Sequence, residues 1–383
     1  MEIRRLTVDD YDELLKMLNY TFGHKYGRPM DFVAEQPKMW VRDEEHMRKH
    51  FGVFEDGKLC SVVGMYPLRA NIMGEEILFA TTGNVATLPE YEGRGYFSKL
   101  FPLVMDACDE EGVDVARLGG SRQRYARYGF EGCGMLYRFT VTEHNVKHYF
   151  KNADEGVELT EIQAGDTDAL MICHELISSR PFYIERSPMY NLRDVYLAMC
   201  SKESVPYLAT RNGEAIGYVC VSHETHINEL CAYTAKDFSA IAVALQRRVK
   251  KNISVPVAPY QLEEMREMGD GADTVNIEIP SRFRIRSFER LTSALMKLKA
   301  SYENLPDFEL TLEIADYGAI TLYCRDGVAG CERTNRSGDL LLDSHAAARL
   351  LFGPLPVSAV ADVPLAARAW LPLPMTWATL DYV

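Results

Sequence analysis

The stretch that decides the fold is NVATLPEYEGRGYFSKLF, residues 84–101. Its start, NVATLP, predicts a strand, and the apolar residues after Gly95 recur at helical spacing. The loop between them holds Gly93 and Gly95. Glycines in such a loop let backbone N–H groups approach an anion, and the start of a helix adds partial positive charge. Taken alone, Gly-Arg-Gly is more often a tight turn, so the surrounding sequence has to decide between the two interpretations.

The composition is that of a globular protein with more than one domain. The chain has 383 residues, 47% hydrophobic and 25% charged, and one domain usually holds about 100–200 residues. A formal net charge of −13 argues against a nucleic-acid partner and is compatible with a cationic substrate. The nine cysteines form no CxxC pair, so we expect neither a disulfide framework nor a zinc site. The start lacks an apolar signal core, and no apolar run reaches about 18 residues, which together predict a cytoplasmic protein without a membrane segment.

Strand and helix patterns divide the chain into three units. Residues 1–150 alternate strands and helices. Residues 151–282 partly repeat that order, with a β-hairpin at Asn212-Gly213 but no glycine loop. Residues 283–383 change to strands with antiparallel alternation. The chain ends in WLPLPMTWATLDYV, residues 370–383, and this apolar tail is expected to pack onto the protein.

The sequence that follows the glycine loop favours anion binding. The predicted helix is followed by a buried strand, VDVARL (113–118), and then by YARYGF (125–130). This order resembles the core of the GNAT acetyltransferase superfamily. With the three units, nearly the whole chain resembles the enhanced intracellular survival (Eis) acetyltransferases. The resemblance implies an α/β (α+β) fold, with two GNAT-like mixed-sheet domains followed by a sterol-carrier-like domain.

The resemblance places an acetyl-CoA site on the strand and loop quoted above. Glu92 and Phe97 stand where the family motif usually has Gln or Arg and Gly or Ala. The acetyl-CoA contacts implied by the motif fall on two sets of residues, the strand residues Val85, Ala86 and Thr87 and the loop residues Gly93, Arg94, Gly95 and Tyr96.

YARYGF supplies the candidate general acid. The resemblance implies that Tyr125 protonates the departing thiolate, and Tyr128 is the competitor. A phenol of pKa about 10 can donate to a thiol whose pKa is about 8.5. For the base, the resemblance implies the α-carboxylate of Val383, with Asp381 nearby.

The acceptor is a coarser expectation. From position alone, Tyr26, Met65 and Asn84 are expected to line its pocket. An acidic pocket would attract a small cationic amine of the polyamine or aminoglycoside kind, and a lysine side chain is the other candidate acceptor. The resemblance also implies a homo-oligomer, a hexamer of three-domain subunits. We expect no metal, because His223 and His226 in HETH lack a third ligand.

Two other functions remain open on the sequence. The chain could bind CoA without catalysis while its last domain carries an apolar ligand, or it could be a non-catalytic scaffold. A tail that fills its own domain and reaches Tyr125 would favour the enzyme, whereas an empty apolar tunnel would favour the carrier.

Overall fold

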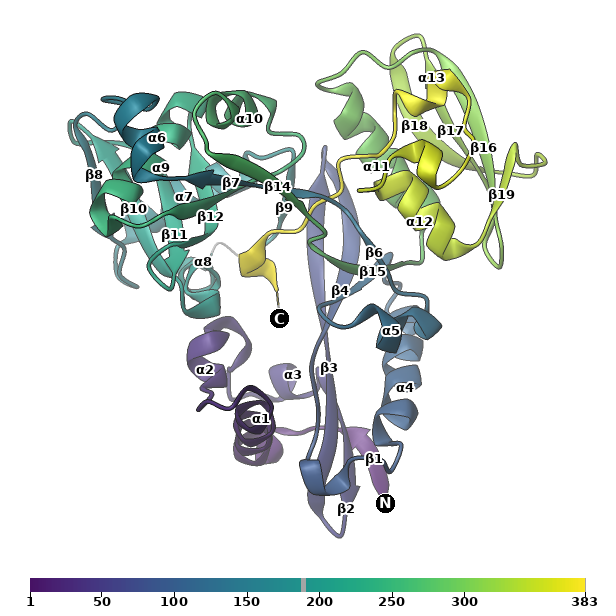
Figure 1. Cartoon of the computed structure of the whole chain (residues 1–383). Coiled ribbons are helices and arrows are strands. Elements are labelled where there is room, and N and C mark those ends of the chain that lie inside the picture. Colours follow the sequence, from purple (N-terminus) through teal and green to yellow (C-terminus); the bar gives the residue numbers. More distant parts are fainter. Residues whose placement is uncertain (187–190, 383) are drawn as a thin grey trace.

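The computed structural model describes residues 1–186 and 191–382. It shows a mixed α/β protein of three lobes, each built on its own sheet (Figure 1). The C-terminal tail leaves the third lobe, passes between the other two and ends in the middle of the molecule.

The first sheet has the strand order β1-β2-β3-β4-β5-β15-β6, and β9 pairs with the far end of β3. Helix α1 buries Leu14 and Leu18 against one face, and helix α4 buries Leu100 and Phe101 against the other. Each such side chain stabilises the fold by about 1.5–3 kcal/mol. The strands are β1 (Glu2–Arg5), β2 (His50–Glu55), β3 (Lys58–Ile72), β4 (Glu75–Thr87), β5 (Val115–Leu118), β6 (Glu131–Cys133), β9 (Phe182–Ile184) and β15 (Ser281–Ile285).

The second sheet has the order β14-β7-β13-β12-β11-β10-β8. Helix α9 packs Phe238, Ile241 and Leu245 into its core. The expected Asn212-Gly213 turn joins β10 to β11, with both residues at positive φ. The strands are β7 (Leu136–Val141), β8 (Val157–Glu161), β10 (Val205–Arg211), β11 (Glu214–Ser222), β12 (His226–Ala232), β13 (Ile253–Val257) and β14 (Thr274–Glu278).

The sheets do not divide the chain at the expected residues 150 and 282. Strand β7 lies within residues 1–150, yet it pairs with β13 and β14 of the second sheet. Strand β15 spans residue 282 and pairs with β5 and β6 of the first sheet. Pairing between distant strands depends on which faces are buried together, and local sequence patterns carry no record of it.

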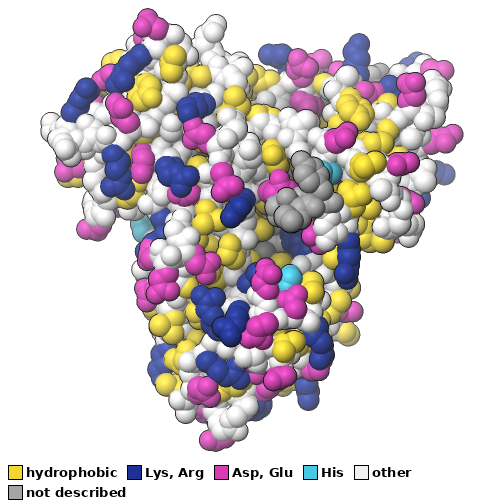
Figure 2. Space-filling model, turned by 180° about the vertical axis from the view of Figure 1, so that it is seen from behind, with side chains coloured by type: hydrophobic (Ala, Val, Ile, Leu, Met, Phe, Trp, Pro, Cys, Tyr) yellow, Lys and Arg dark blue, Asp and Glu magenta, His cyan; other side chains and the backbone are white. Residues whose placement is uncertain are grey.

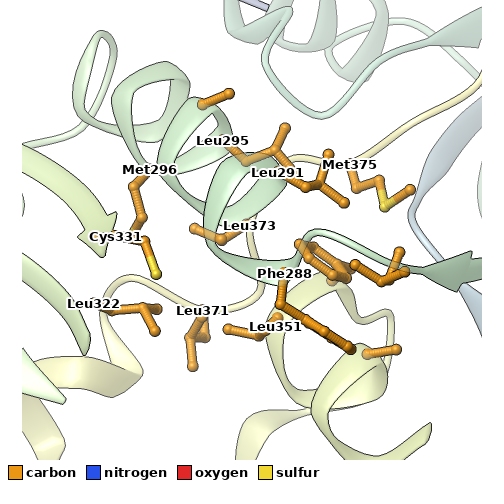
Figure 3. Packing of buried hydrophobic residues seen from close by; sticks show 14 of the residues in the cluster. Phe288, Leu291, Leu295, Met296, Leu322, Cys331, Leu351, Leu371, Leu373 and Met375 are labelled. Atoms are coloured by element: carbon orange, nitrogen blue, oxygen red, sulfur yellow. The ribbon is translucent and has the colours of Figure 1, made fainter. Parts of the chain in front are cut away.

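The third sheet has the order β18-β17-β16-β19 and is covered by α11. Its core is continuous with the tail: Leu371, Leu373 and Met375 point into the same cluster as Phe288 and Leu291 of α11 (Figure 3). The tail therefore fills its own lobe. The strands are β16 (Phe308–Ile314), β17 (Gly318–Arg325), β18 (Val328–Thr334) and β19 (Leu340–Leu342).

Helices of very different length connect these strands. Among the described helices α1, α4 and α9 are the longest, and α1 and α4 belong to the first lobe and frame the site described below. The helices are α1 (Tyr11–Tyr26), α2 (Phe32–Glu35), α3 (Glu44–Met47), α4 (Tyr96–Glu110), α5 (Arg122–Tyr125), α6 (Glu143–His148), α7 (Thr167–Ser178), α8 (Leu192–Met199), α9 (Ala235–Val249), α10 (Leu262–Gly269), α11 (Phe288–Ala300), α12 (Ser344–Phe352) and α13 (Leu365–Arg368).

An irregularity in β4 opens the first sheet. The β3–β4 register shifts between Val62 and Gly64, where β4 carries one extra residue and Asn84 adopts φ 52°. This is a β-bulge, which bends the strand that carries it. The parallel pairing of β4 with β5 ends at Thr82 and Leu118, so the last residues of β4 continue past the end of that pairing.

Candidate active site

Two adjoining cavities lie at this opening. The loop cavity, of about 610 Å³, is lined by residues 85–87 of β4, by the loop before α4 and by Arg127. The tyrosine cavity, of about 480 Å³, is lined by Asn84, Tyr125 and the start of the loop after β5. They share Phe22, Lys25, Val85 and Arg124. The two cavities therefore adjoin along these four residues.

The loop before α4 has the form of an anion cradle. Gly93 has φ 76° and Gly95 has φ 75°, a left-handed conformation that favours glycine. A Cβ atom at either position would meet no atom within 4 Å, so the backbone here faces open space. Gly95 is the N-cap of α4, whose first N–H groups have no acceptor within the helix.

The side chains of Arg94 and Tyr96 are both held by Glu55 on β2. Arg94 Nη1 donates to Glu55 Oε2 at 3.0 Å, and the Tyr96 hydroxyl donates to the other oxygen of the same carboxylate. The Arg94 guanidinium also lies over the Tyr91 ring, 4.6 Å from its centroid. Both side chains therefore fix the loop to β2.

Two arginines that the sequence reasoning missed line the loop cavity instead. Arg124 and Arg127 flank Tyr125 in the α5 segment, and Lys25 reaches the same cavity from α1. Glu92 lines it too and is exposed. The signal was present as the run of arginines in SRQRYAR, residues 121–127, but the sequence did not show that this segment faces the glycine loop.

Tyr125 lies in the wall of the tyrosine cavity and is 4% exposed. Its ring packs against Phe97 at 5.8 Å, against Phe101 at 5.4 Å and against Phe130 at 6.3 Å between centroids. Burial raises the pKa of the Tyr125 hydroxyl, and Arg124 opposes this shift. A neutral phenol that keeps its proton at neutral pH is the form that can act as an acid.

Tyr128 faces another part of the surface. It lines a separate groove next to α11, and its hydroxyl accepts a hydrogen bond from Arg127 Nη2 at 3.1 Å. Its ring packs on Phe101 at 4.6 Å. Of the two tyrosines in YARYGF, the structure brings Tyr125 to the shared cavities.

A buried hydrogen-bond chain ends at Asn84 in the tyrosine cavity. Asn84 Nδ2 donates to the Tyr66 hydroxyl at 2.6 Å, and that hydroxyl is 2.7 Å from His50 Nε2. His50 Nδ1 lies 3.3 Å from the carbonyl of Met47, which can only accept, so Nδ1 carries the proton. Nε2 then accepts from Tyr66. Because Asn84 Nδ2 is used as the donor to Tyr66, the Oδ1 atom of the same amide is the acceptor that remains for a molecule in the cavity.

Of the three residues expected to line the acceptor pocket, two line the tyrosine cavity and one does not. Tyr26 and Asn84 line the tyrosine cavity. Met65 does not face it, because it is 1% exposed and accepts a contact from Cys108 Sγ at 3.3 Å in the core beneath α4. The expected acidic character is also absent from the described lining, where Lys25, Arg124 and Lys202 stand against one carboxylate, Glu35.

The tail ends beside this cavity. Lys38 Nζ donates to the Leu380 carbonyl at 2.5 Å. In the amide orientation that satisfies both of its ends, Gln36 donates to the Tyr382 carbonyl at 3.2 Å and accepts from Lys202 Nζ at 2.6 Å. Gln36 and Lys202 both line the tyrosine cavity. Tyr382 is thus one residue removed from its wall, and Val383 lies outside the described residues.

A buried ion network fixes the residue before Tyr382. Arg186 donates to both oxygens of Glu229, at 2.8 and 2.7 Å, and to both oxygens of Asp381, at 3.0 and 3.1 Å. The three side chains are at most 4% exposed. Asp381 is therefore committed to holding the tail, which leaves it a poor candidate for the base.

Comparison with known proteins defines the class. Residues 2–133 match the family model of the acetyltransferase (GNAT) domain. They form a GNAT acetyltransferase domain, and the protein is an acetyltransferase.

The fold of the whole chain also occurs in solved structures. The match with a GCN5-related N-acetyltransferase from Kribbella flavida covers 100% of both chains, at 21% identity and a TM-score of 0.64. Against one from Anabaena variabilis, the coverage is again complete in both directions, with 14% identity and a TM-score of 0.68. Against Eis1 from Mycobacterium abscessus, the match covers 99% of this chain and 98% of that one, at 15% identity and a TM-score of 0.67. Comparison with curated proteins gave no match.

The described residues contain no group of three or more His, Cys, Asp or Glu side chains that could hold a metal ion. None of their helices combines the length and the apolar character needed to cross a membrane.

Proposed function

We propose that the protein is an N-acetyltransferase that transfers the acetyl group of acetyl-CoA directly to a primary amine. The observation that carries the proposal is the meeting of the two cavities, with an anion cradle in one and Tyr125 in the wall of the other. A ternary complex without a covalent enzyme intermediate needs this geometry, because both substrates must reach each other inside the protein.

The loop cavity suits the CoA moiety. Backbone N–H groups of residues 93–96 would contact its pyrophosphate, and Arg124 and Arg127 would balance its charge. The end of β4, at Val85, Ala86 and Thr87, would pair with the amides of pantetheine. The fit rests on the two left-handed glycines, whose missing side chains leave room for a phosphate.

Tyr125 is the proposed general acid. The amine nitrogen forms a bond to the acetyl carbon, the carbon–sulfur bond breaks, and the leaving sulfur takes the proton of the Tyr125 hydroxyl. The proton lost by the amine goes to a base, for which we propose the α-carboxylate of Val383, acting directly or through water. The position of Tyr382 supports this assignment, because its carbonyl accepts from Gln36, and Gln36 lines the tyrosine cavity.

The experiment is a pair of matched tyrosine variants. Tyr125→Phe removes only the proposed acid and should lower kcat by about 10²–10⁴, with acetyl-CoA affinity nearly unchanged by calorimetry. Tyr128→Phe is the control, because its hydroxyl faces another groove. CoA release across a panel of polyamines, aminoglycosides and lysine peptides measures both variants. Equal turnover of Tyr125→Phe and wild type would refute the general-acid role.

The larger-scale parts of the proposal have separate support. A cytoplasmic enzyme acting on small molecules or lysine side chains fits the reduced cysteines. We propose a homo-oligomer, a hexamer by resemblance. The edge strand β14 supports a subunit contact because its Val275 and Ile277 are more than half exposed. The third lobe is proposed to be sterol-carrier-like, but a carrier role is disfavoured by the tail residues that fill its core.

A further inference from the structure

The charge of the tyrosine cavity limits the chemical class of amine that can serve as the acceptor. Among the described residues, three basic side chains line this cavity, Lys25, Arg124 and Lys202, and Glu35 supplies the only carboxylate. Lys202 Nζ is 3.5 Å from Glu35 Oε1, so this carboxylate is already paired. On the face drawn in Figure 2, the Lys and Arg side chains of the lower lobe stand among Asp and Glu side chains, so the excess of basic groups is a property of the cavity lining and not of this surface.

A fourth cation lies beneath the cavity. Arg117 on β5 is completely buried, and its Nε donates to Ser281 Oγ at 2.7 Å. Its Nη1 and Nη2 have no hydrogen-bond partner among the described residues. A Cβ atom at Gly119, which lines the cavity, would lie 3.8 Å from Arg117 Nη2 and would meet no other atom within 4 Å. Arg117 does not itself line the cavity, and its guanidinium stacks on the Tyr382 ring, but its Nη2 lies close behind the cavity wall at Gly119.

The electrostatics of the neighbouring lysines agree with this geometry. Burial lowers the pKa of Lys202, and Arg117 lowers it further while Glu35 opposes the shift. Burial likewise lowers the pKa of Lys38 to about 8, with Arg117 and Lys202 adding to the effect and Asp381 opposing it. Each cation in this group thus raises the free energy of the others, and an anion placed among them would relieve that repulsion.

The amine end of an acceptor has a separate contact. Asn84 Oδ1 is the free acceptor at the end of the His50–Tyr66–Asn84 chain, and it can receive a hydrogen bond from an amine N–H. A cation would be repelled by the surrounding charges, so the neutral amine that attack requires is the favoured form.

We propose that the acceptor is a small amine that carries a carboxylate, with the carboxylate held by Lys202 and Arg117 and the amine by Asn84. This rests on the proposed N-acetyltransferase function and replaces the cationic acceptor class. An α-carboxylate of Val383 near Lys202 and Arg117 would compete with the carboxylate of the acceptor, and equal use of both members of each amine pair in the test below is the result expected in that case.

The test compares amines that differ only by an α-carboxylate: tyrosine with tyramine, phenylalanine with phenethylamine, and lysine with cadaverine. We expect kcat/KM to favour the carboxylated member by about tenfold or more, the effect of one charge-assisted hydrogen bond. Lys202→Gln should remove most of that preference, and Arg117→Met is the second variant if the first is poorly folded. Lys236→Gln, exposed on α9, is the control. Acetyl-CoA affinity should be unchanged in Lys202→Gln, because Lys202 lines only the tyrosine cavity of the two.

Calorimetry of tyrosine and tyramine on the CoA-saturated protein separates the two proposals. Tighter binding of tyrosine without turnover would support the carboxylate site and refute the transferase. Turnover that favours tyramine and cadaverine would refute the carboxylate site and leave the transferase standing. Equal use of both members of every pair, as expected if the cations serve only CoA phosphates or the chain's own terminus, would also refute it.

Discussion

Tyr125 depends on the absence of a side chain at Gly120. A Cβ atom there would lie 2.6 Å from Tyr125 Cε2 and 3.1 Å from Cδ2. The three phenylalanines around the ring leave it little room to move aside. Gly120 is thus a positioning residue for the proposed acid.

We therefore expect Gly120→Ala to lower kcat by up to about 10², the cost of a shift of about 1 Å in a reacting group. Gly165→Ala is the matched control, since its Cβ would meet nothing within 4 Å and its backbone is not left-handed. Steady-state kinetics and acetyl-CoA calorimetry on both variants provide the measurement. Wild-type turnover in Gly120→Ala would show that the ring position does not matter.

At single residues, the sequence was informative where chemistry is local. Gly93 and Gly95 were picked out from EGRGYF, and both adopt the left-handed conformation. The choice of Tyr125 over Tyr128 came from the resemblance of YARYGF and stays a prediction. Arg94 illustrates the limit, because its partner Glu55 lies on β2, almost 40 residues away. The prediction that Met65 lines the acceptor pocket was wrong for a related reason. Strand alternation does not tell which face of the sheet borders a cavity and which borders α4.

At the scale of elements, three neighbouring strands share one buried hydrogen-bond chain. His50 begins β2, Tyr66 lies on β3 and Asn84 forms the bulge of β4. The Trp40 ring stacks on His50 at 5.9 Å. The chain therefore fixes the bulge at which the first sheet opens.

This chain makes stability depend on pH. Burial lowers the pKa of His50 to about 4, and Lys49 and His46 lower it further, against the carbonyls of Met47 and His46. His50 in the unfolded chain has an ordinary pKa of about 6.5. Between pH 6.5 and 4 the unfolded chain therefore binds a proton at this residue and the folded chain does not. Stability is therefore complete above pH 6.5 and falls between pH 6.5 and 4, by about 3 kcal/mol at 1.36 kcal/mol per pKa unit.

His50→Gln can still accept from Tyr66 but cannot titrate. Its unfolding free energy, measured with urea between pH 7 and 4.5, should fall less steeply than that of the wild type. An identical slope in both proteins would place the acid sensitivity elsewhere.

The elements themselves were largely predictable, whereas their partners were not. The Asn212-Gly213 turn and the helix after Gly95 follow from backbone preferences within a few residues. Strands β7 and β15 joined sheets outside their expected units, because burial shared across more than 100 residues selects those partners.

At the scale of the molecule, the tail connects all three lobes. Its Leu373 and Met375 belong to the third lobe's core, and its Leu380 carbonyl accepts from Lys38 of the first. Its Asp381 accepts from Arg186, which also donates to Glu229 of the second. The Tyr382 ring then lies 3.9 Å from the guanidinium carbon of Arg117. The described end of the tail is therefore positioned by the whole fold. The apolar composition of residues 370–383 predicted that the tail packs onto the protein, but not which residues of the three lobes hold it.

The chemical role of that end can be tested without disturbing its supports. A Gly-Ser extension after Val383 removes the α-carboxylate from its place but leaves Lys38, Arg186 and Asp381 unchanged. If this carboxylate is the base, kcat at neutral pH should fall by about 10²–10⁴, and the loss should shrink at higher pH as the amine deprotonates in solution. The thermal midpoint should stay that of the wild type, because the ion network is intact. The same extension placed before Met1, which is 67% exposed, is the control. If the extended chain keeps wild-type turnover across the pH range, the base is another group.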